Sequence, residues 1–438
     1  LTGSIGLGKP SIGEEVIMKK AIAFSMAVFI CAGLCIPGTA AAPTYPDAPV
    51  YGDEKAQKTL IEENPLETDL LDAINTFSYA CSPEILYGQA GNTIYSPTAL
   101  YMSLSLAATG ARGDTRQELL EVLGMKNKTI SYLSKQNGNL FRRLYTNNGI
   151  GVFRLASSFW LHDNAIFRSD FNDTAASQFY TETMNVDFAR LSVARQISEW
   201  IVKNSSGNVV PPVKIAASQQ LSIINVPYFE DEWLYAFDPA NTEAGPFALA
   251  NGNTAIGSFM KGTLASAEVY RAEGNFTRLR VPLKSGGSML LILPDEGVGV
   301  NQLLNSPETT TALFAPGGEN QQVALSLPKF SFSADLTFNN ALKSMGILTP
   351  FSEQADFSAM VSGGKTTLTD VRQQAAISIG EYGIGTSSNT EVKTNIRKAG
   401  KTTELTFDRP FLFAITSDSS IDREIPLLIG VVNKPSVT

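Results

Sequence analysis

Alternating side chains mark one segment near the C-terminal end of the chain. Six of the seven residues on one face are β-branched and none of the seven is charged; they are Ile384, Thr386, Ser388, Thr390, Val392, Thr394 and Ile396. The residues between them are small or polar, and this two-residue period is typical of a strand that buries one face. The same segment is rich in Gly, Ser, Asn and Thr, as exposed loops are, and it lacks proline. The pattern predicts two states, one solvated and one paired in a sheet.

Helical patterns come first in the part of the chain that follows residue 65, where helical and strand patterns alternate. Residues 70–80 predict one helix, and residues 98–108 are mostly apolar, which predicts a buried one. Thr115 and Glu118 have the spacing of a capping box, which would open a further helix that ends at Gly124.

Strand patterns come later in the chain. Alternating apolar residues at 279–283, a Gly-Gly turn and a continuous apolar run at 288–293 predict a hairpin, and residues 323–327 alternate in the same way. Helices followed by strands predict an α+β fold whose large sheet is not built from βαβ units.

The first 65 residues predict export and a spacer. Basic residues at 19–20, an apolar run at 21–36 and small residues at 38–42 indicate a signal peptide at 18–42, preceded by a non-native or upstream extension at 1–17. Residues 43–65 have the composition of a polar, Pro-rich spacer. The apolar run is short for a membrane span, so we expect a secreted, periplasmic or cell-surface protein with no other membrane contact. Removing the signal leaves Cys81 as the one cysteine, which excludes an intrachain disulfide.

Composition and candidate chemistry argue against an enzyme. The net charge of −8 disfavours nucleic-acid binding, and no motif for a metal or another cofactor is visible. The single histidine, His162, has the pattern of a strand end and would have to carry any Ser-His-Asp triad alone. Ser362 and Lys365 fit a β-lactamase motif, but two intervening glycines predict a turn where that chemistry needs a helix start. The Arg-Gly-Asp tripeptide at 112–114 is interpreted as a structural turn.

The residues that follow the alternating segment resemble the C-terminal signature of the serpins. These are Phe407-Asp-Arg-Pro-Phe-Leu-Phe and Pro426-Leu-Leu-Ile-Gly-Val-Val-Asn-Lys-Pro. Further motifs in the family's order lie at residues 92–97, 110–115, 200–209, 225–233, 237–242, 327–330, 346–348 and 355–358. The resemblance is to a secreted, prokaryotic-type member with a serpin domain at 66–438. It implies three β-sheets, eight to nine helices and an exposed reactive-centre loop at about 381–406.

The resemblance implies a protease inhibitor that acts as a suicide substrate. The family's spacing assigns the reactive bond to Arg397–Lys398, with Lys398 as the alternative reactive residue, and arginine suits the carboxylate pocket of a trypsin-like protease. The expected partner is that protease in a covalent complex with a monomeric inhibitor. The hinge positions are Glu381, Gly383, Ile384 and Thr386, and the positions beneath and at the opening of the sheet are Ser96, Asn225, Trp233 and Gln373.

Departures from the family pattern leave an alternative open. Polar residues at 386–389 replace the usual alanines after the hinge, and Gln373 stands where the family has a histidine. We expect Gln373 to hydrogen-bond with Ser96 and Asn225 without titrating. The alternative is a non-inhibitory serpin-fold binding or carrier protein that proteases cleave as a substrate.

Overall fold

The computed structural model describes residues 43–207, 213–386, 402–418, 420–421 and 423–435. These residues form ten α-helices and two short 3-10 helices. The α-helices are α2 (Glu54–Glu63), α3 (Thr68–Leu86), α4 (Pro97–Gly110), α5 (Gly113–Val122), α6 (Ile130–Leu144), α7 (Ser169–Gln178), α8 (Leu191–Asn204), α9 (Val300–Leu303), α10 (Pro307–Phe314) and α11 (Asn339–Ser344). The 3-10 helices are η1 (Pro239–Asn241) and η2 (Thr349–Phe351).

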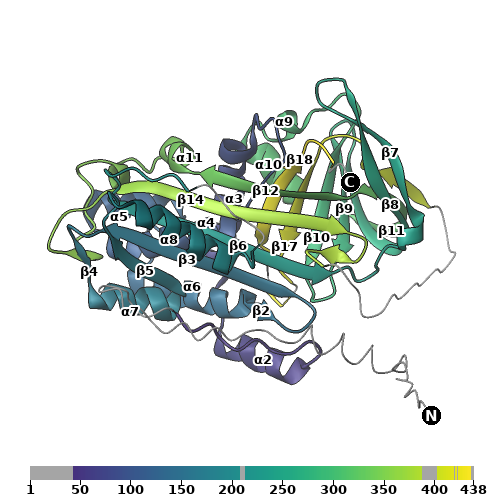
Figure 1. The fold of residues 1–438 in the computed structure, drawn as a ribbon. Coiled ribbons are helices and arrows are strands. Elements are labelled where there is room, and N and C mark those ends of the chain that lie inside the picture. The colour runs from purple at the N-terminus through teal and green to yellow at the C-terminus, as the bar shows by residue number, and fades with distance from the viewer. Residues whose placement is uncertain (1–42, 208–212, 387–401, 419, 422, 436–438) are drawn as a thin grey trace, which may run out of the picture. The chain divides into compact units, whose positions relative to one another are not determined.

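The strands form three sheets (Figure 1). A seven-stranded sheet has the order β12 (Phe330–Thr337), β14 (Leu368–Gly380), β15 (Gly383–Ile384), β6 (Leu221–Glu232), β3 (Val152–His162) and β2 (Thr146–Asn147), with β5 (Thr181–Val186) also beside β3. A nine-stranded sheet has the order β1 (Thr93–Tyr95), β18 (Pro426–Val432), β17 (Phe411–Thr416), β10 (Ser288–Pro294), β9 (Phe276–Pro282), β8 (Thr254–Ala272), β11 (Glu319–Pro328) and β16 (Thr403–Thr406), with β7 (Thr242–Ala248) beside β8. A third sheet pairs β4 (Ile166–Phe167) with β13 (Val361–Ser362).

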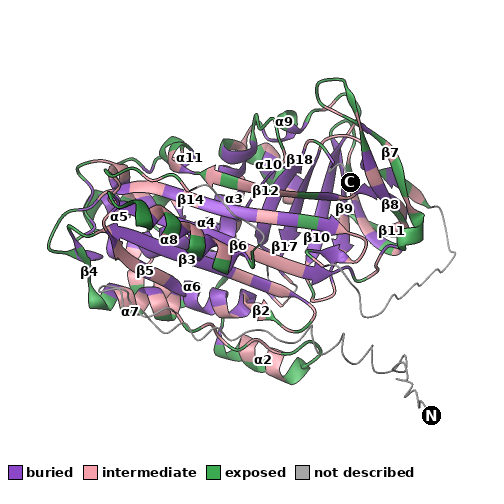
Figure 2. Ribbon diagram, in the orientation of Figure 1, coloured by how far each residue is buried: buried purple, intermediate pink, exposed green. Residues whose placement is uncertain are grey.

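Helices cover both faces of the seven-stranded sheet. On the inner face, α4 is buried along almost its whole length and contacts β3 and β6. On the outer face, Ile197 and Trp200 of α8 pack in one apolar cluster with Trp160 of β3 and Ile224 of β6. Figure 2 shows the resulting buried stretches along β3 and β6. A strand added between β6 and β14 would therefore meet protein on both faces near the middle of the sheet.

Most elements predicted from periodicity are confirmed. The helices expected at 70–80 and 98–108 are α3 and α4, and the hairpin expected at 279–293 is β9–β10. The α+β class and the three sheets are also confirmed, with ten α-helices in the described residues in place of the eight or nine expected. His162 ends β3, as its sequence context predicted, and Gly363 follows β13 in a turn with φ +82°.

The predicted capping box at Thr115 is wrong. Helix α5 already begins at Gly113, so Thr115 lies inside its first turn. The Thr115 hydroxyl instead accepts a hydrogen bond from the backbone N–H of Asp356 at 2.9 Å, and the Glu118 carboxylate accepts from the N–H of Thr349 at 2.7 Å. Both side chains hold a distant segment, which the local spacing could not reveal.

The stretch expected to be a polar spacer packs against the folded body. It contains α2, and the ring of Tyr45 stacks on Tyr145 at 5.4 Å and on Phe141 at 6.0 Å between ring centroids. The predicted signal peptide and the extension before it lie outside the described residues. Within the described part of the chain, no helix has the length and apolar character needed to cross a membrane. Cys81 is a buried free thiol.

Candidate functional site at the opening of the seven-stranded sheet

The seven-stranded sheet is open between β6 and β14 over half of their length. In the closed half, the two strands pair directly in parallel, from Leu368 with Leu221 to Gln373 with Asn225. Beyond those pairs the strands separate, and the two-residue strand β15 lies between their ends, antiparallel to both. We call the stretch between residues 374–378 and 226–230, where no strand lies between β14 and β6, the slot.

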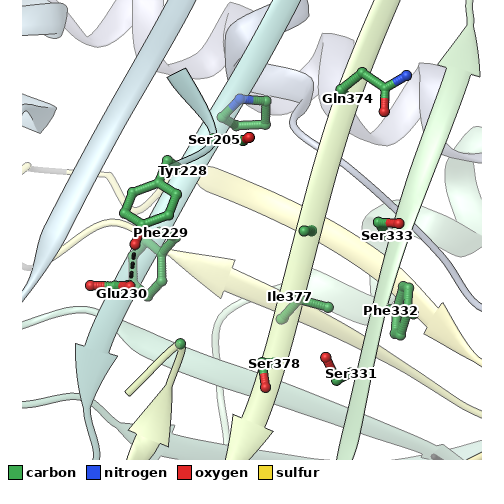
Figure 3. Close-up of a pocket in the computed structure, with 13 residues that line it drawn as sticks. Ser205, Tyr228, Phe229, Glu230, Ser331, Phe332, Ser333, Gln374, Ile377 and Ser378 are labelled. Atoms are coloured by element: carbon green, nitrogen blue, oxygen red, sulfur yellow. Dashed lines mark hydrogen bonds between the residues drawn. The ribbon is translucent and has the colours of Figure 1, made fainter. Parts of the chain in front are cut away.

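The slot holds a cavity of about 420 Å³. Residues of β6, β14 and β12 line most of it (Figure 3), and Ser205 and Gly385 complete the lining. The wall on β6 includes Tyr228, whose hydroxyl donates a hydrogen bond to the Glu230 carboxylate. Backbone groups of two neighbouring strands thus face a space that lacks a strand, which is the geometry that strand addition requires.

The two strands keep one register in both halves. Gln373 is level with Asn225 where the strands pair directly, and Ile379 and Asp231 are level because both pair with Ile384. The offset between the strands is therefore the same with and without an intervening strand. Extending β15 into the closed half requires β6 and β14 to separate sideways by one strand spacing, about 4.8 Å, with no sliding along their axes.

Glu381 fixes the turn that leads from β14 into β15. Its carboxylate lies 2.9 Å from the Lys329 ammonium and accepts a hydrogen bond from the Thr242 hydroxyl at 3.0 Å. Burial acts to raise the pKa of Glu381, but these two partners outweigh it and hold the pKa below its ordinary value. The Glu381 and Tyr382 carbonyls accept from the N–H groups of Phe237 and Trp233.

Gly383 and Ile384 seat the start of the loop in the sheet. A Cβ on Gly383 would lie 2.1 Å from the Asp231 carbonyl oxygen, so no other residue fits without displacing β15. Ile384 is only 1% exposed and belongs to the main apolar core. Gly385 then donates a hydrogen bond from its N–H to the Ser378 carbonyl at 2.7 Å, and the Thr386 hydroxyl is buried without a partner in the described residues.

Charged and aromatic residues form the wall beside β15. The Trp233 indole donates to the Gly380 carbonyl at 2.9 Å, and Glu232 pairs with Lys284 at 2.8 Å. Burial raises the pKa of Asp231 to about 7, although its carboxylate accepts a hydrogen bond from the Ser285 hydroxyl at 3.1 Å.

Two amide side chains tie the closed half to α4. The Gln373 amide accepts from the Ser96 N–H at 2.5 Å and donates to the Ser96 carbonyl at 3.2 Å. The Asn225 carbonyl oxygen accepts from the hydroxyls of Ser103 at 2.6 Å and Ser157 at 2.7 Å. The expected contact of Gln373 with Ser96 is present, whereas Gln373 makes no hydrogen bond with Asn225, whose amide turns toward the two serines.

Sequence reasoning missed several residues that hold this region. Ser103 and Ser157 bind Asn225, and Lys329 binds Glu381, although none of the three was assigned a role. Ser103 could have been suspected, because it lies seven residues, or about two helical turns, after Ser96 on a predicted helix. Lys329 lies in the motif at 327–330, but nothing local indicated its partner or any role for Ser157, since both contacts join distant parts of the chain.

The expected reactive bond, Arg397–Lys398, lies outside the described residues. The described chain resumes at Thr402 and enters β16, which runs parallel to β11. Within the described residues, no group of three His, Cys, Asp or Glu side chains could hold a metal ion.

Comparisons with known proteins agree with this geometry. The family model described as serpin (serine protease inhibitor) matches residues 72–435. The chain belongs to the serpin family. It is similar to Serpin-Z1A of Triticum aestivum, with 28% identity over 79% of this chain and 90% of that protein. The relatives compared are plant serpins, which give no support to the expected prokaryotic type.

Solved structures show the same serpin fold. The chain is similar to Serpin48 of the insect Tenebrio molitor, with a TM-score of 0.77 and 22% identity over 84% of this chain and 99% of that one. It is also similar to thyroxine-binding globulin in complex with thyroxine, with a TM-score of 0.72 and 22% identity over 84% of this chain and all of that one. The family is described as one of serine protease inhibitors.

Proposed function

We propose that this serpin traps trypsin-like serine proteases as a suicide substrate, with cleavage at Arg397–Lys398. The observation that carries the proposal is the slot: the start of the reactive loop already lies between β6 and β14, in a register that can continue. The strand-patterned sequence from Ile384 to Ile396 supplies what such a slot needs, namely no proline and no charge on the inner face.

The chemistry follows from the order of two competing steps. The protease serine attacks the Arg397 carbonyl carbon, the bond to the Lys398 nitrogen breaks, and Lys398 leaves as an amine after taking up a proton. The Arg397 carbonyl is then an ester of the protease. The freed segment 385–396 extends β15 and displaces the attached protease before water hydrolyses the ester. Slow extension would let hydrolysis finish, and the protein would be an ordinary substrate.

The proposal includes a monomeric protein that acts outside the cytoplasm. A residue pattern at 18–42 that is typical of a secretory signal supports export. Because extension of β15 uses β6 and β14 of the same chain, trapping requires no second copy.

Denaturing gel electrophoresis after incubation with trypsin tests the proposal. We expect a band near the summed mass of protease and inhibitor, because the ester survives detergent and boiling. Clean cleavage without that band would refute trapping and favour the alternative, a serpin-fold binding protein that is cut as a substrate. Wild type with catalytically inactive trypsin is the control.

Two variants locate the bond. Arg397→Leu should abolish trapping of trypsin and favour proteases with apolar pockets, since the guanidinium supplies the charge that a carboxylate pocket recognises. Lys398→Leu should still trap trypsin. The reverse result would move the reactive residue to Lys398, and mass analysis of the released fragment distinguishes the two.

A further inference from the structure

A second cavity, of about 760 Å³, lies where the C-terminal end of α3 meets the end of β18. The turn after β7, the start of α9 and the residues just before β17 complete its lining. Small-molecule sites typically measure about 300–1,000 Å³. None of the residues that line this cavity also lines the slot, so a ligand here would not compete with the loop for the same space.

Hydrogen bonds between distant segments fix the walls of this cavity. The Asn433 side-chain amide donates to the carbonyls of Gly91 at 2.7 Å and Gln89 at 3.0 Å, which ties the end of β18 to the end of α3. The Asn301 side-chain oxygen accepts from the Gly88 N–H at 3.0 Å, which ties α9 to the same place. The walls are therefore preformed, and a ligand would not have to order them on binding.

Apolar side chains provide much of the lining. Leu86 and Val431 are each only 1% exposed, and Val300 is 8% exposed. Leu249 and Val298 are half-buried beside them. An apolar chain lying against these residues would be removed from water, which favours binding.

Arg409 places a fixed guanidinium in this lining. Its Nε atom donates to the Pro294 carbonyl at 3.0 Å, and its Nη1 atom donates to the Asp408 carboxylate at 2.9 Å. The Nη2 atom makes no hydrogen bond with a described residue, and the side chain is 27% exposed. One donor of a held arginine is thus available to an arriving acceptor, although Asp408 offsets part of its charge.

Lys434 supplies a second cation. Its backbone is held on both sides by Asn92, which accepts from the Lys434 N–H at 2.9 Å and donates to the Lys434 carbonyl at 2.8 Å. The Lys434 ammonium forms no ion pair with a described residue. Among the described residues that line the cavity, Arg409 and Lys434 are the charged ones and none is acidic, so the lining favours an anion.

From the preformed apolar wall and these two cations, we propose that the cavity binds a small amphipathic carboxylate. Its apolar chain packs against Leu86 and Val431, and its carboxylate accepts hydrogen bonds from Arg409 Nη2 and the Lys434 ammonium. Hydrogen bonds between ionised partners are the stronger kind. A neutral apolar guest would displace water from Arg409 without replacing its hydrogen bond, which costs free energy.

Isothermal titration calorimetry of the wild-type protein with decanoate tests the proposal. We expect one decanoate to bind per chain. Acetate, which has the carboxylate without the chain, and decanol, which has the chain without the charge, should each bind about tenfold more weakly or not at all.

Two variants with matched controls locate the site. Ala250 is an exposed residue of the lining, so Ala250→Trp should fill the entrance and weaken decanoate binding at least about tenfold. Ala244→Trp makes the same change at an exposed position of β7 outside the lining and should bind as wild type does. Lys434→Gln should weaken binding about two- to five-fold, the effect of one exposed ion pair, whereas Lys55→Gln on α2 should have no effect.

Three results would overturn the proposal. Decanol binding as tightly as decanoate would remove the role of the two cations. Equal binding by Ala250→Trp and Ala244→Trp would place the ligand elsewhere. A wild-type dimer in sedimentation that Ala250→Trp converts to a monomer would show that a second copy of the chain covers the cavity. None of these results depends on whether the protein traps trypsin, so the inhibitor proposal is tested separately.

Discussion

The two halves of the β6–β14 pair differ in what lies between the strands, although their register is the same. In the half that contains the slot, which we call the upper half, β15 and a cavity separate the two strands. In the closed half, the two strands pair directly. The upper half is fixed by an ion pair, Glu381–Lys329, whereas the closed half is tied to α4 through neutral amides, Gln373 and Asn225. The sheet is thus prepared for a longer β15 at one end and held shut at the other.

The anchors on α4 show where resistance to insertion lies. Gln373 of β14 is bound to Ser96, and Asn225 of β6 is bound to Ser103, about 10 Å further along the helix. Since the two strands are bound to one helix at separate points, they cannot move apart without breaking or shifting at least one of these contacts. The closed half is therefore the barrier that an inserting loop must cross.

A charge on the inner face of the loop should have the largest effect on trapping, because it removes the uncharged face that allows the loop to lie between β6 and β14. Continued register places Thr386 between Ile377 and Phe229, where Thr386→Arg would bury an unpaired charge at a cost of several kcal/mol. The variant should lose trapping and be cleaved at the same bond. Gel electrophoresis measures the ratio of complex to cleaved product.

The neighbouring residue provides the control. Ser387→Arg places the same side chain on the outer face and should trap almost as well as wild type. Equal behaviour of the two variants would mean that the alternation in the loop is incidental.

A methyl group at Gly383 should expel β15 from the upper half. The added Cβ of Gly383→Ala would overlap the Asp231 carbonyl, so we expect a loss of about 1–3 kcal/mol in the free energy of unfolding of the uncleaved protein. Gly380 of β14 pairs with Gly383, and the new Cβ of Gly380→Ala would have no atom within 4 Å. This variant should therefore lose much less free energy of unfolding. Urea denaturation of both variants measures the difference. Similar midpoints would show that β15 contributes little to the native sheet.

Periodicity predicted those helices and strands whose structure is decided by which of their faces is buried. The apolar runs at 70–80 and 98–108 and the alternating hairpin at 279–293 gave the correct elements because burial alone decides them. The loop segment was recognised as strand-like for the same reason, and the structure finds its first residue, Ile384, paired in β15.

Contacts between distant segments could not be predicted in this way. Thr115 and Glu118 fit a local capping motif, yet their side chains bind residues more than 200 positions away. Tyr45 lies in a polar stretch, and no neighbouring residue predicted that its ring stacks on Phe141 and Tyr145. Sequence spacing describes neighbours along an element, whereas these contacts depend on how elements meet.

The pH dependence of the free energy of unfolding should distinguish the two halves. The carboxyl group of Asp231 lies beside β15, whereas the anchors in the closed half are amides, which do not titrate. Asp231 has a pKa near 7 in the folded protein because it is buried, against about 3.9 when unfolded. Between these values the folded state holds a proton that the unfolded state has lost, so rising pH favours unfolding. Wild type should lose at most ~1.4 kcal/mol per pH unit across this window relative to Asp231→Asn, and level off above it. Urea denaturation of both proteins from pH 4.5 to 8 measures the difference between the two curves. Parallel curves would show that Asp231 is ionised in the folded sheet, and that its buried charge is stabilised by the Ser285 hydroxyl and the backbone N–H of Glu232.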